Sequence, residues 1–210
     1  PRRVLPTPFP KKGRYSFTLT SLACLPGIED NAFPRLMTTL LQDFTSIGIQ
    51  PRFAIVVSRF NADITDSLLA GAQGAFSDAG LPDNALSIHF VPGAFELPFL
   101  CDQLAKSGNF SAILALGCVI RGDTPHFDFV AGQCAKGIEE SSRKRGVPII
   151  FGVLTTDTFA QAKHRASTQA LQGSNAFESN RQEKVTPESN KGAEAASTAM
   201  AMAEAMETLV

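Results

Sequence analysis

Short apolar runs alternate with longer amphipathic segments from residue 52 to the end of the chain. Runs of β-branched and other apolar residues, each bounded by turn residues, predict four strands at 53–58, 86–91, 112–117 and 148–154. The spacing of apolar positions predicts five helices at 65–79, 95–106, 127–145, 158 to about 170 and 192–209. Because such alternation is typical of a parallel sheet covered on both faces, we expect a small three-layer α/β sandwich with a four-stranded parallel sheet.

Two segments lack this alternation. Residues 171–188 are polar, contain Gly173 and Pro187, and predict a loop inserted between the last two helices. Residues 1–22 contain five basic and no acidic side chains, net +5, which leaves 14 basic and 20 acidic side chains, net −6, for the rest of the chain. We therefore predict an N-terminal extension over 1–51, poorly ordered or transit-like, followed by one domain over 52–210.

Composition and charge exclude several classes of protein. A formal net charge of −1 provides no basic field for holding nucleic acid phosphates. The apolar runs are far shorter than the roughly 18 to 20 residues of a membrane-spanning helix. The cysteines form no CxxC pair and have no histidine at metal spacing, so we expect buried thiols and neither a zinc site nor a disulfide framework: Cys24, Cys101, Cys118 and Cys134. Such thiols favour the cytoplasm, or a plastid if residues 1–51 include a transit peptide.

The unusual motifs of the chain follow the predicted strands, which is where open parallel α/β sheets bind their ligands. The first strand is followed by Arg59 and Phe60 in place of the glycine-rich turn of a dinucleotide site. Ser58 is the only hydroxyl at that turn, which disfavours the phosphate loop of a flavodoxin-type site. The strand ends therefore predict a site that neither common nucleotide fold explains.

Phe60 and Glu96 are the candidate ligand contacts after the first two strands. Phe60 offers an aromatic face on which a planar heterocycle can stack, or it is one of the 16 phenylalanines packed in a core or hinge. Glu96 can accept hydrogen bonds from sugar-like hydroxyls, or it stabilises the first turn of a helix. Each residue on its own fits both interpretations.

Anion binding is predicted after the third strand and on the last two helices. Asp123 precedes a predicted helix start, where backbone N–H groups form an anion site, or it caps that helix. The imidazole of His126 beside it can move protons, although a lone histidine is more often structural. Arg165 and Lys191 are candidates for binding phosphate or a heterocycle carbonyl, or they are solvated surface charges.

Five stretches in order carry a family resemblance: RFN at 59–61, VPGAFELP at 91–98, LGCVIRGDTPHFD at 116–128, FGVLTT at 151–156 and NKGAE at 190–194. Together they resemble the 6,7-dimethyl-8-ribityllumazine synthases over about residues 52–210, apart from 171–188. The resemblance implies a flavodoxin-like fold and a transferase that condenses 5-amino-6-(D-ribitylamino)pyrimidine-2,4-dione with 3,4-dihydroxy-2-butanone 4-phosphate. Phosphate and water are released at this penultimate step of riboflavin biosynthesis, and no metal or organic cofactor takes part.

The resemblance also implies a role for each motif residue. His126 is implied as the catalytic residue that moves protons, with Glu194 orienting it or relaying its proton. Because the family builds its site between subunits, one group of residues would face the site from the neighbouring chain: Phe151, Arg165 and Lys191. The implied substrate-binding residues are Phe60, Ala94, Phe95, Glu96, Val119, Ile120, Asp123, Thr124, Phe151, Arg165 and Lys191.

The end of the fourth helix departs from the family pattern. Where the family commonly has Arg-Ala-Gly-x-Lys, this chain has RASTQ at 165–169 and so lacks one basic residue. We expect weaker phosphate affinity as a result, unless Arg181 or Lys184 compensates. Family members form pentamers, and some form shells of sixty subunits through contacts near this bend. Because a long polar loop adds bulk and an ordering cost there, we expect a homo-oligomer that is a pentamer or decamer rather than a shell. The alternatives are a non-catalytic scaffold or shell assembly, or a flavin-binding module, on the same fold.

Overall fold

The computed structural model describes residues 51–167 and 190–209, which all belong to one compact unit of the chain. Except for Pro51, the predicted extension at 1–51 lies outside the described residues, and the predicted insertion at 171–188 lies outside them entirely. Within the described residues, no helix is both long enough and apolar enough to cross a membrane.

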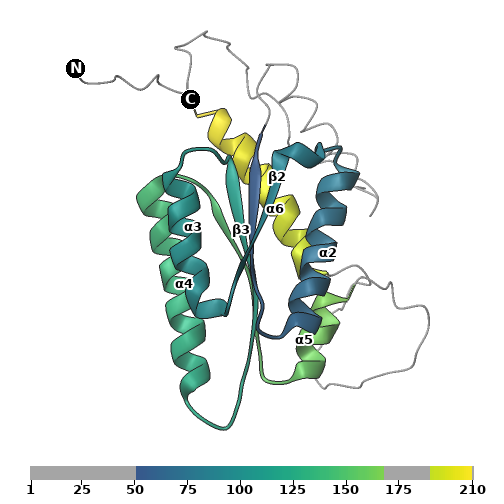
Figure 1. Ribbon diagram of the computed structural model, residues 1–210, viewed down its shortest axis with the longest axis vertical. Coiled ribbons are helices and arrows are strands. Elements are labelled where there is room, and N and C mark those ends of the chain that lie inside the picture. Colours follow the sequence, from purple (N-terminus) through teal and green to yellow (C-terminus); the bar gives the residue numbers. More distant parts are fainter. Residues whose placement is uncertain (1–50, 168–189, 210) are drawn as a thin grey trace, which may run out of the picture. The chain divides into compact units, whose positions relative to one another are not determined.

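The described strands form a four-stranded parallel sheet in the order β2-β1-β3-β4 (Figure 1). Their bounds are β1 Phe53–Ser58, β2 Leu86–Val91, β3 Ala112–Ile120 and β4 Ile149–Thr156. The predicted ranges of β1 and β2 are confirmed. The predicted ends of β3 and β4 are wrong, because the ladder between these two strands continues to the pair of Ile120 and Thr156.

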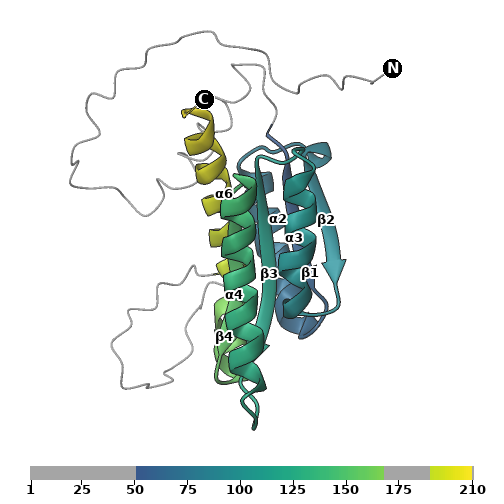
Figure 2. The same ribbon diagram turned by 90° about the vertical axis from the view of Figure 1, so that its left-hand side faces the viewer.

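Helices cover both faces of the sheet, as Figures 1 and 2 show. One face carries α2 (Ala62–Asp78), α5 (Phe159–Ala166) and α6 (Lys191–Glu207), and the other carries α3 (Leu97–Lys106) and α4 (His126–Arg145). Two 3-10 turns, η1 (Asp83–Ala85) and η2 (Ala94–Glu96), precede β2 and α3. This arrangement confirms the predicted three-layer α/β sandwich.

The central strand β1 explains why two cores form, one on each face of the sheet. All six of its side chains are buried, and they alternate between the faces. Phe53, Ile55 and Val57 enter the core beneath α2 and α6, while Ala54 and Val56 enter the core beneath α3 and α4. Burial of each large apolar side chain contributes about 1.5–3 kcal/mol, so one strand stabilises both helical layers.

Local sequence signals explain where several helices end. As predicted, α2 ends just before Gly80 (φ 82°) and α4 ends at Gly146 (φ 66°), positions where the left-handed backbone favours glycine. The prediction for α5 is wrong at both described ends. Thr158 caps this helix through a reciprocal capping box with Gln161, and Ser167 is already extended at φ −69° and ψ 133°.

Candidate active site

The loops that follow β1 and β2 are joined by hydrogen bonds, which places two of the predicted motifs side by side. The backbone N–H of Phe60 donates to the carbonyl of Pro92 at 3.1 Å. The next residue, Asn61, has a left-handed backbone (φ 59°) that asparagine tolerates, and its Nδ2 donates to the carbonyl of Cys118 in β3 at 3.0 Å. The structure therefore brings the ends of the first three strands in the chain together, as the parallel topology predicts.

Phe60 and Phe95 are exposed at these strand ends. Phe60 is 68% exposed and Phe95 is 58% exposed, so neither ring belongs to the core. The alternative interpretation of Phe60 as a core aromatic is therefore wrong. Because an exposed aromatic ring gains free energy when it is covered, two such rings on neighbouring loops suit the binding of an apolar or planar ligand.

Ala94 and Glu96 lie in η2, directly before α3. Ala94 is buried, whereas Glu96 is exposed and its side chain makes no capping hydrogen bond to the helix that follows. Gly93 leaves room for the carboxylate, since a Cβ at that position would lie 3.0 Å from Glu96 Oε2. The carboxylate oxygens can therefore accept hydrogen bonds from a ligand.

The end of β3 leads into the start of α4. Val119 and Ile120 are half-buried residues of β3 itself, not of the loop after it. Asp123, Thr124 and His126 are exposed. The interpretation of Asp123 as the N-cap is wrong, because Pro125 occupies that position and α4 begins at His126. No side chain caps the start of this 20-residue helix, where the Asp128 N–H donates to the Pro125 carbonyl at 3.0 Å. The N–H groups of His126 and Phe127 are those that could meet an anion.

Arg121 holds the turn between β3 and α4. Its guanidinium pairs with Asp128 in the first turn of α4 at 3.2 Å and with Asp157 after β4 at 3.1 Å. It also lies over the ring of Phe127, 4.1 Å from the ring centroid. Hydrogen bonds to the two carboxylates raise the pKa of Arg121 above its ordinary value, so its positive charge is secure. These contacts join the end of β3 to the start of α4 and to the end of β4.

A second group of predicted residues lies elsewhere, in a groove of about 430 Å³ between β4 and the helices α5 and α6. Phe151, Arg165, Lys191 and Glu194 all line it. Lys191 begins α6, and its Nζ contacts both carboxylate oxygens of Glu194, at 2.8 and 2.7 Å. We call this groove the β4–α6 groove. None of the residues at the first three strand ends lines it, so within one chain the structure separates the predicted site residues into two groups.

Comparison with known proteins decides the family. The family model of 6,7-dimethyl-8-ribityllumazine synthase matches residues 50–207, a range that includes both groups of site residues. A curated relative, the 6,7-dimethyl-8-ribityllumazine synthase of Desulfatibacillum aliphaticivorans, is 50% identical over 119 residues, which cover 57% of this chain and 77% of the relative.

The chain belongs to the 6,7-dimethyl-8-ribityllumazine synthase family.

This assignment confirms the family predicted from the five sequence motifs. It also confirms the predicted class of function, a transferase of riboflavin biosynthesis, which is the function of the family. The predicted roles of individual residues remain predictions and are taken up below.

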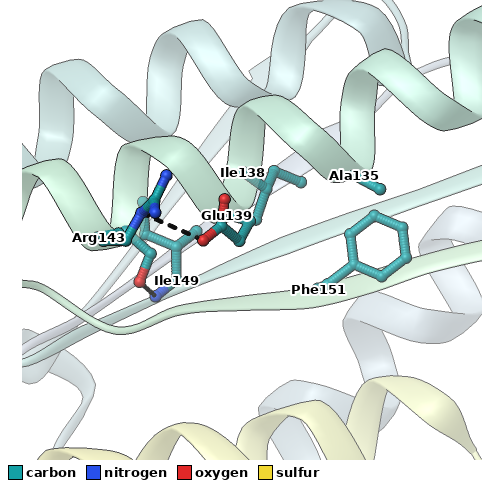
Figure 3. Close-up of a pocket in the computed structure, with 7 residues that line it drawn as sticks. Ala135, Ile138, Glu139, Arg143, Ile149 and Phe151 are labelled. Atoms are coloured by element: carbon teal, nitrogen blue, oxygen red, sulfur yellow. Dashed lines mark hydrogen bonds and ion pairs between the residues drawn. The ribbon is translucent and has the colours of Figure 1, made fainter.

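A second groove, of about 300 Å³, lies on the other face of β4 against α4 (Figure 3). We call it the β4–α4 groove, and its lining residues are Ala135, Ile138, Glu139, Ser142, Arg143, Ile149 and Phe151. Glu139 and Arg143 form an ion pair at 3.3 Å along one side. Sequence reasoning missed this groove, because the apolar positions of α4 indicate packing on the sheet and do not reveal that β4 is the edge strand.

The described cysteines take no part in either group of site residues. Cys101, Cys118 and Cys134 are free and buried, as predicted, whereas Cys24 lies outside the described residues. Burial raises the pKa of Cys101 and of Cys134 to about 12 and that of Cys118 to about 11, so all three stay protonated near neutral pH. Among the described residues, no cluster of three or more histidine, cysteine or acidic side chains is suited to hold a metal ion.

Proposed function

We propose that this chain condenses 5-amino-6-(D-ribitylamino)pyrimidine-2,4-dione with 3,4-dihydroxy-2-butanone 4-phosphate to give 6,7-dimethyl-8-ribityllumazine. The observation that carries the proposal is the family match over residues 50–207, a range in which exposed residues at the strand ends can stack on a ring, accept hydrogen bonds and transfer protons. No metal or organic cofactor is required, because amine attack on a ketone and loss of phosphate proceed by proton transfer alone.

The strand ends supply the binding site for the pyrimidine substrate. The exposed ring of Phe60 stacks on the pyrimidinedione, and backbone groups of Val119 and Ile120 contact its polar edge. Ala94, Phe95 and Glu96 line the ribityl chain, with the Glu96 carboxylate accepting hydrogen bonds from its hydroxyls. Fixing this substrate turns a bimolecular encounter into an oriented one, which contributes several kcal/mol to catalysis.

The phosphate of the second substrate binds at the start of α4. Backbone N–H groups there, together with Asp123 N–H and the Thr124 hydroxyl, donate hydrogen bonds to it. Arg165 is its main cationic partner, and Lys191 adds a second positive charge. These donors stabilise the charge that develops when phosphate leaves, which is the step that a positive pocket assists most.

His126 moves protons during the reaction. It is exposed at the first position of α4, next to the proposed phosphate site. The 5-amino group attacks the ketone and one water is lost to form an imine. Phosphate is then eliminated, and the resulting enol tautomerises to a ketone. The ribitylamino nitrogen attacks this carbonyl, and a second water is lost as the ring closes. Each step transfers a proton, for which an imidazole is suited because it can both donate and accept one. Glu194 of a neighbouring subunit orients this imidazole or relays its proton.

The complete site forms between two subunits. The residues at the strand ends and those of the β4–α6 groove form separate groups in one chain, so a second copy supplies Phe151, Arg165 and Lys191 to the strand ends of the first. This arrangement requires a homo-oligomer, which we propose is a pentamer or decamer. β4 is an edge strand of the described sheet, so its outer edge is available for contact with a neighbouring subunit.

One experiment separates the candidate functions. The purified protein is mixed with both substrates and lumazine formation is followed by absorbance, while flavin binding is titrated separately. We expect lumazine formation that depends on both substrates. Absence of product from a folded oligomer would support the non-catalytic scaffold, and flavin binding without turnover would support the flavin-binding module.

A further inference from the structure

A buried asparagine joins the two helices that carry the cations of the β4–α6 groove. Asn190 is 5% exposed and directly precedes α6. Its Nδ2 donates to the carbonyl of Ala166, the last residue of α5, at 2.6 Å, and to the carbonyl of Ser67 in α2 at 3.0 Å. Its Oδ1 accepts from the backbone N–H groups of Gly192 and Ala193 at 2.8 and 3.2 Å. One side chain therefore contacts three helices, with both N–H groups and both acceptor positions in use.

Two glycines provide the space for this side chain. A Cβ at Gly71 of α2 would overlap Asn190 Oδ1, and a Cβ at Gly192 would overlap the carbonyl oxygen of Leu68. The close approach of α6 to α2 therefore depends on glycine in both helices. Because the amide is enclosed and fully bonded, it has little freedom to shift, and the start of α6 is fixed with it.

The two proposed phosphate-binding cations lie directly beside the hydrogen bonds of Asn190. Arg165 directly precedes Ala166, whose carbonyl accepts from Asn190, and Lys191 directly follows Asn190. Both cations line the β4–α6 groove. In sequence they are separated by residues 166–190, whereas across the Asn190 amide the two helix ends are joined by one hydrogen bond of 2.6 Å. The amide therefore fixes the backbone positions from which the two cationic side chains extend, and Glu194 in addition holds Lys191 Nζ.

We propose that Asn190 is a positioning residue that holds Arg165 and Lys191 at the spacing needed to bind one phosphate group. The inference rests on the proposed phosphate role of Arg165. Asn190 itself is buried and acts through its two neighbours, so it contacts no substrate.

The main test variant is Asn190→Asp, which keeps oxygen acceptors for the start of α6 but removes both N–H donors to α5 and α2. We expect the KM for the butanone phosphate to rise roughly ten- to a hundred-fold, because small displacements of a phosphate-binding group have effects of that order. The KM for the pyrimidine substrate should stay near the wild-type value, whereas kcat should fall as well, because Arg165 also stabilises the leaving phosphate. The matched control is Asn84→Asp, which makes the same change at an exposed residue of η1.

A second pair of variants tests the same contact from α2. Gly71→Ala places a methyl group against the Asn190 amide and should raise the same KM, whereas Gly74→Ala on the same helix has nothing within 4 Å and should not. Asn190 itself is not substituted in this pair, so the pair gives a result even if the Asn190→Asp variant fails to fold.

Two further measurements keep the inference separate from the proposed function. Calorimetric titration with inorganic phosphate should show weaker binding in Asn190→Asp and Gly71→Ala, even if wild-type protein forms no lumazine. Amide hydrogen exchange should be faster at the end of α5 and the start of α6 in the same variants. Unchanged phosphate binding and an unchanged phosphate KM in both variants would overturn the proposal. Faster hydrogen exchange with an unchanged phosphate KM would overturn it as well, because Asn190 would then have only a structural role.

Discussion

Ser58 ends β1 with a hydroxyl that is fully buried, and among the described residues its Oγ has no hydrogen-bond partner. Burial of an unbonded hydroxyl costs free energy, because the group loses its bonds to water. We expect Ser58→Ala to leave the free energy of unfolding unchanged or to raise it by about 1 kcal/mol. Urea unfolding followed by circular dichroism measures the difference.

Ser141 offers a matched control for this change. It is also buried, but its Oγ donates to the carbonyl of Gly137 at 2.7 Å, so Ser141→Ala should cost about 1 kcal/mol. A loss of stability in Ser58→Ala as large as that in Ser141→Ala would show that the Ser58 hydroxyl is hydrogen-bonded after all.

His126 and Arg165 should differ in what they contribute to the proposed reaction. We expect His126→Ala to lower kcat by roughly a hundred-fold, the lower end of what acid–base catalysis provides. Arg165→Ala should lower kcat/KM for the butanone phosphate by roughly a thousand-fold, because it removes both phosphate affinity and stabilisation of the leaving group. Steady-state assays that vary one substrate at a time measure both effects.

Lys163→Ala is the control for Arg165→Ala, since Lys163 is an exposed cation of the same helix and does not line the β4–α6 groove. A wild-type rate in Arg165→Ala would remove the proposed phosphate role of this residue. Equal losses in the two variants would point to a general effect of charge instead.

At the scale of elements, α3 and α4 are joined by one ion pair. Arg145 Nε and Nη2 donate to the two carboxylate oxygens of Asp102 at 2.8 and 2.6 Å. Hydrogen bonding from Arg145 lowers the pKa of Asp102 below its ordinary value of 3.8. The folded protein therefore binds fewer protons at this site than the unfolded chain, and the resulting stability is present above about pH 4 and is lost as the pH falls through the lowered pKa.

This ion pair predicts a change in the acid sensitivity of the protein. Arg145→Leu should lower the free energy of unfolding near pH 6, and the difference from wild type should shrink as the pH falls below about 4. Denaturant unfolding at a series of pH values measures it. Arg143→Leu serves as control, because its pair with Glu139 is exposed and should contribute little at any pH. A difference that is constant with pH would show that Arg145 acts only through packing.

Features set by local sequence patterns could be predicted, whereas features set by contacts between distant residues could not. The strands β1 and β2 could be predicted because turn residues bound their apolar runs, and the strand-end residues could be predicted because parallel strands end at one edge. The continuation of β3 through Val119 and Ile120 depends on pairing with β4, which no local pattern reveals. The bonds of Asn190 to Ala166 and Ser67 join distant parts of the sequence, so periodicity gave no sign of them.

At the scale of the whole molecule, the proposed assembly follows from the separation of the two groups of site residues. We expect wild-type protein to sediment as a pentamer or decamer, because ordering the long polar sequence at 171–188 would add a free-energy cost to the assembly of a shell. Analytical ultracentrifugation and electron microscopy measure the state. Shells of sixty copies would contradict the prediction, and an active monomer would contradict the proposal that two subunits form each site.

Phe151 of the edge strand β4 is among the lining residues of both the β4–α6 groove and the β4–α4 groove. We expect an occupant of one groove that displaces Phe151 to change the space available in the other. By thermodynamic linkage the effect is reciprocal: if filling the β4–α4 groove alters affinity in the β4–α6 groove by some factor, then filling the β4–α6 groove alters affinity in the β4–α4 groove by the same factor. We therefore expect contacts on one face of β4 to be coupled to ligand binding on the other through Phe151.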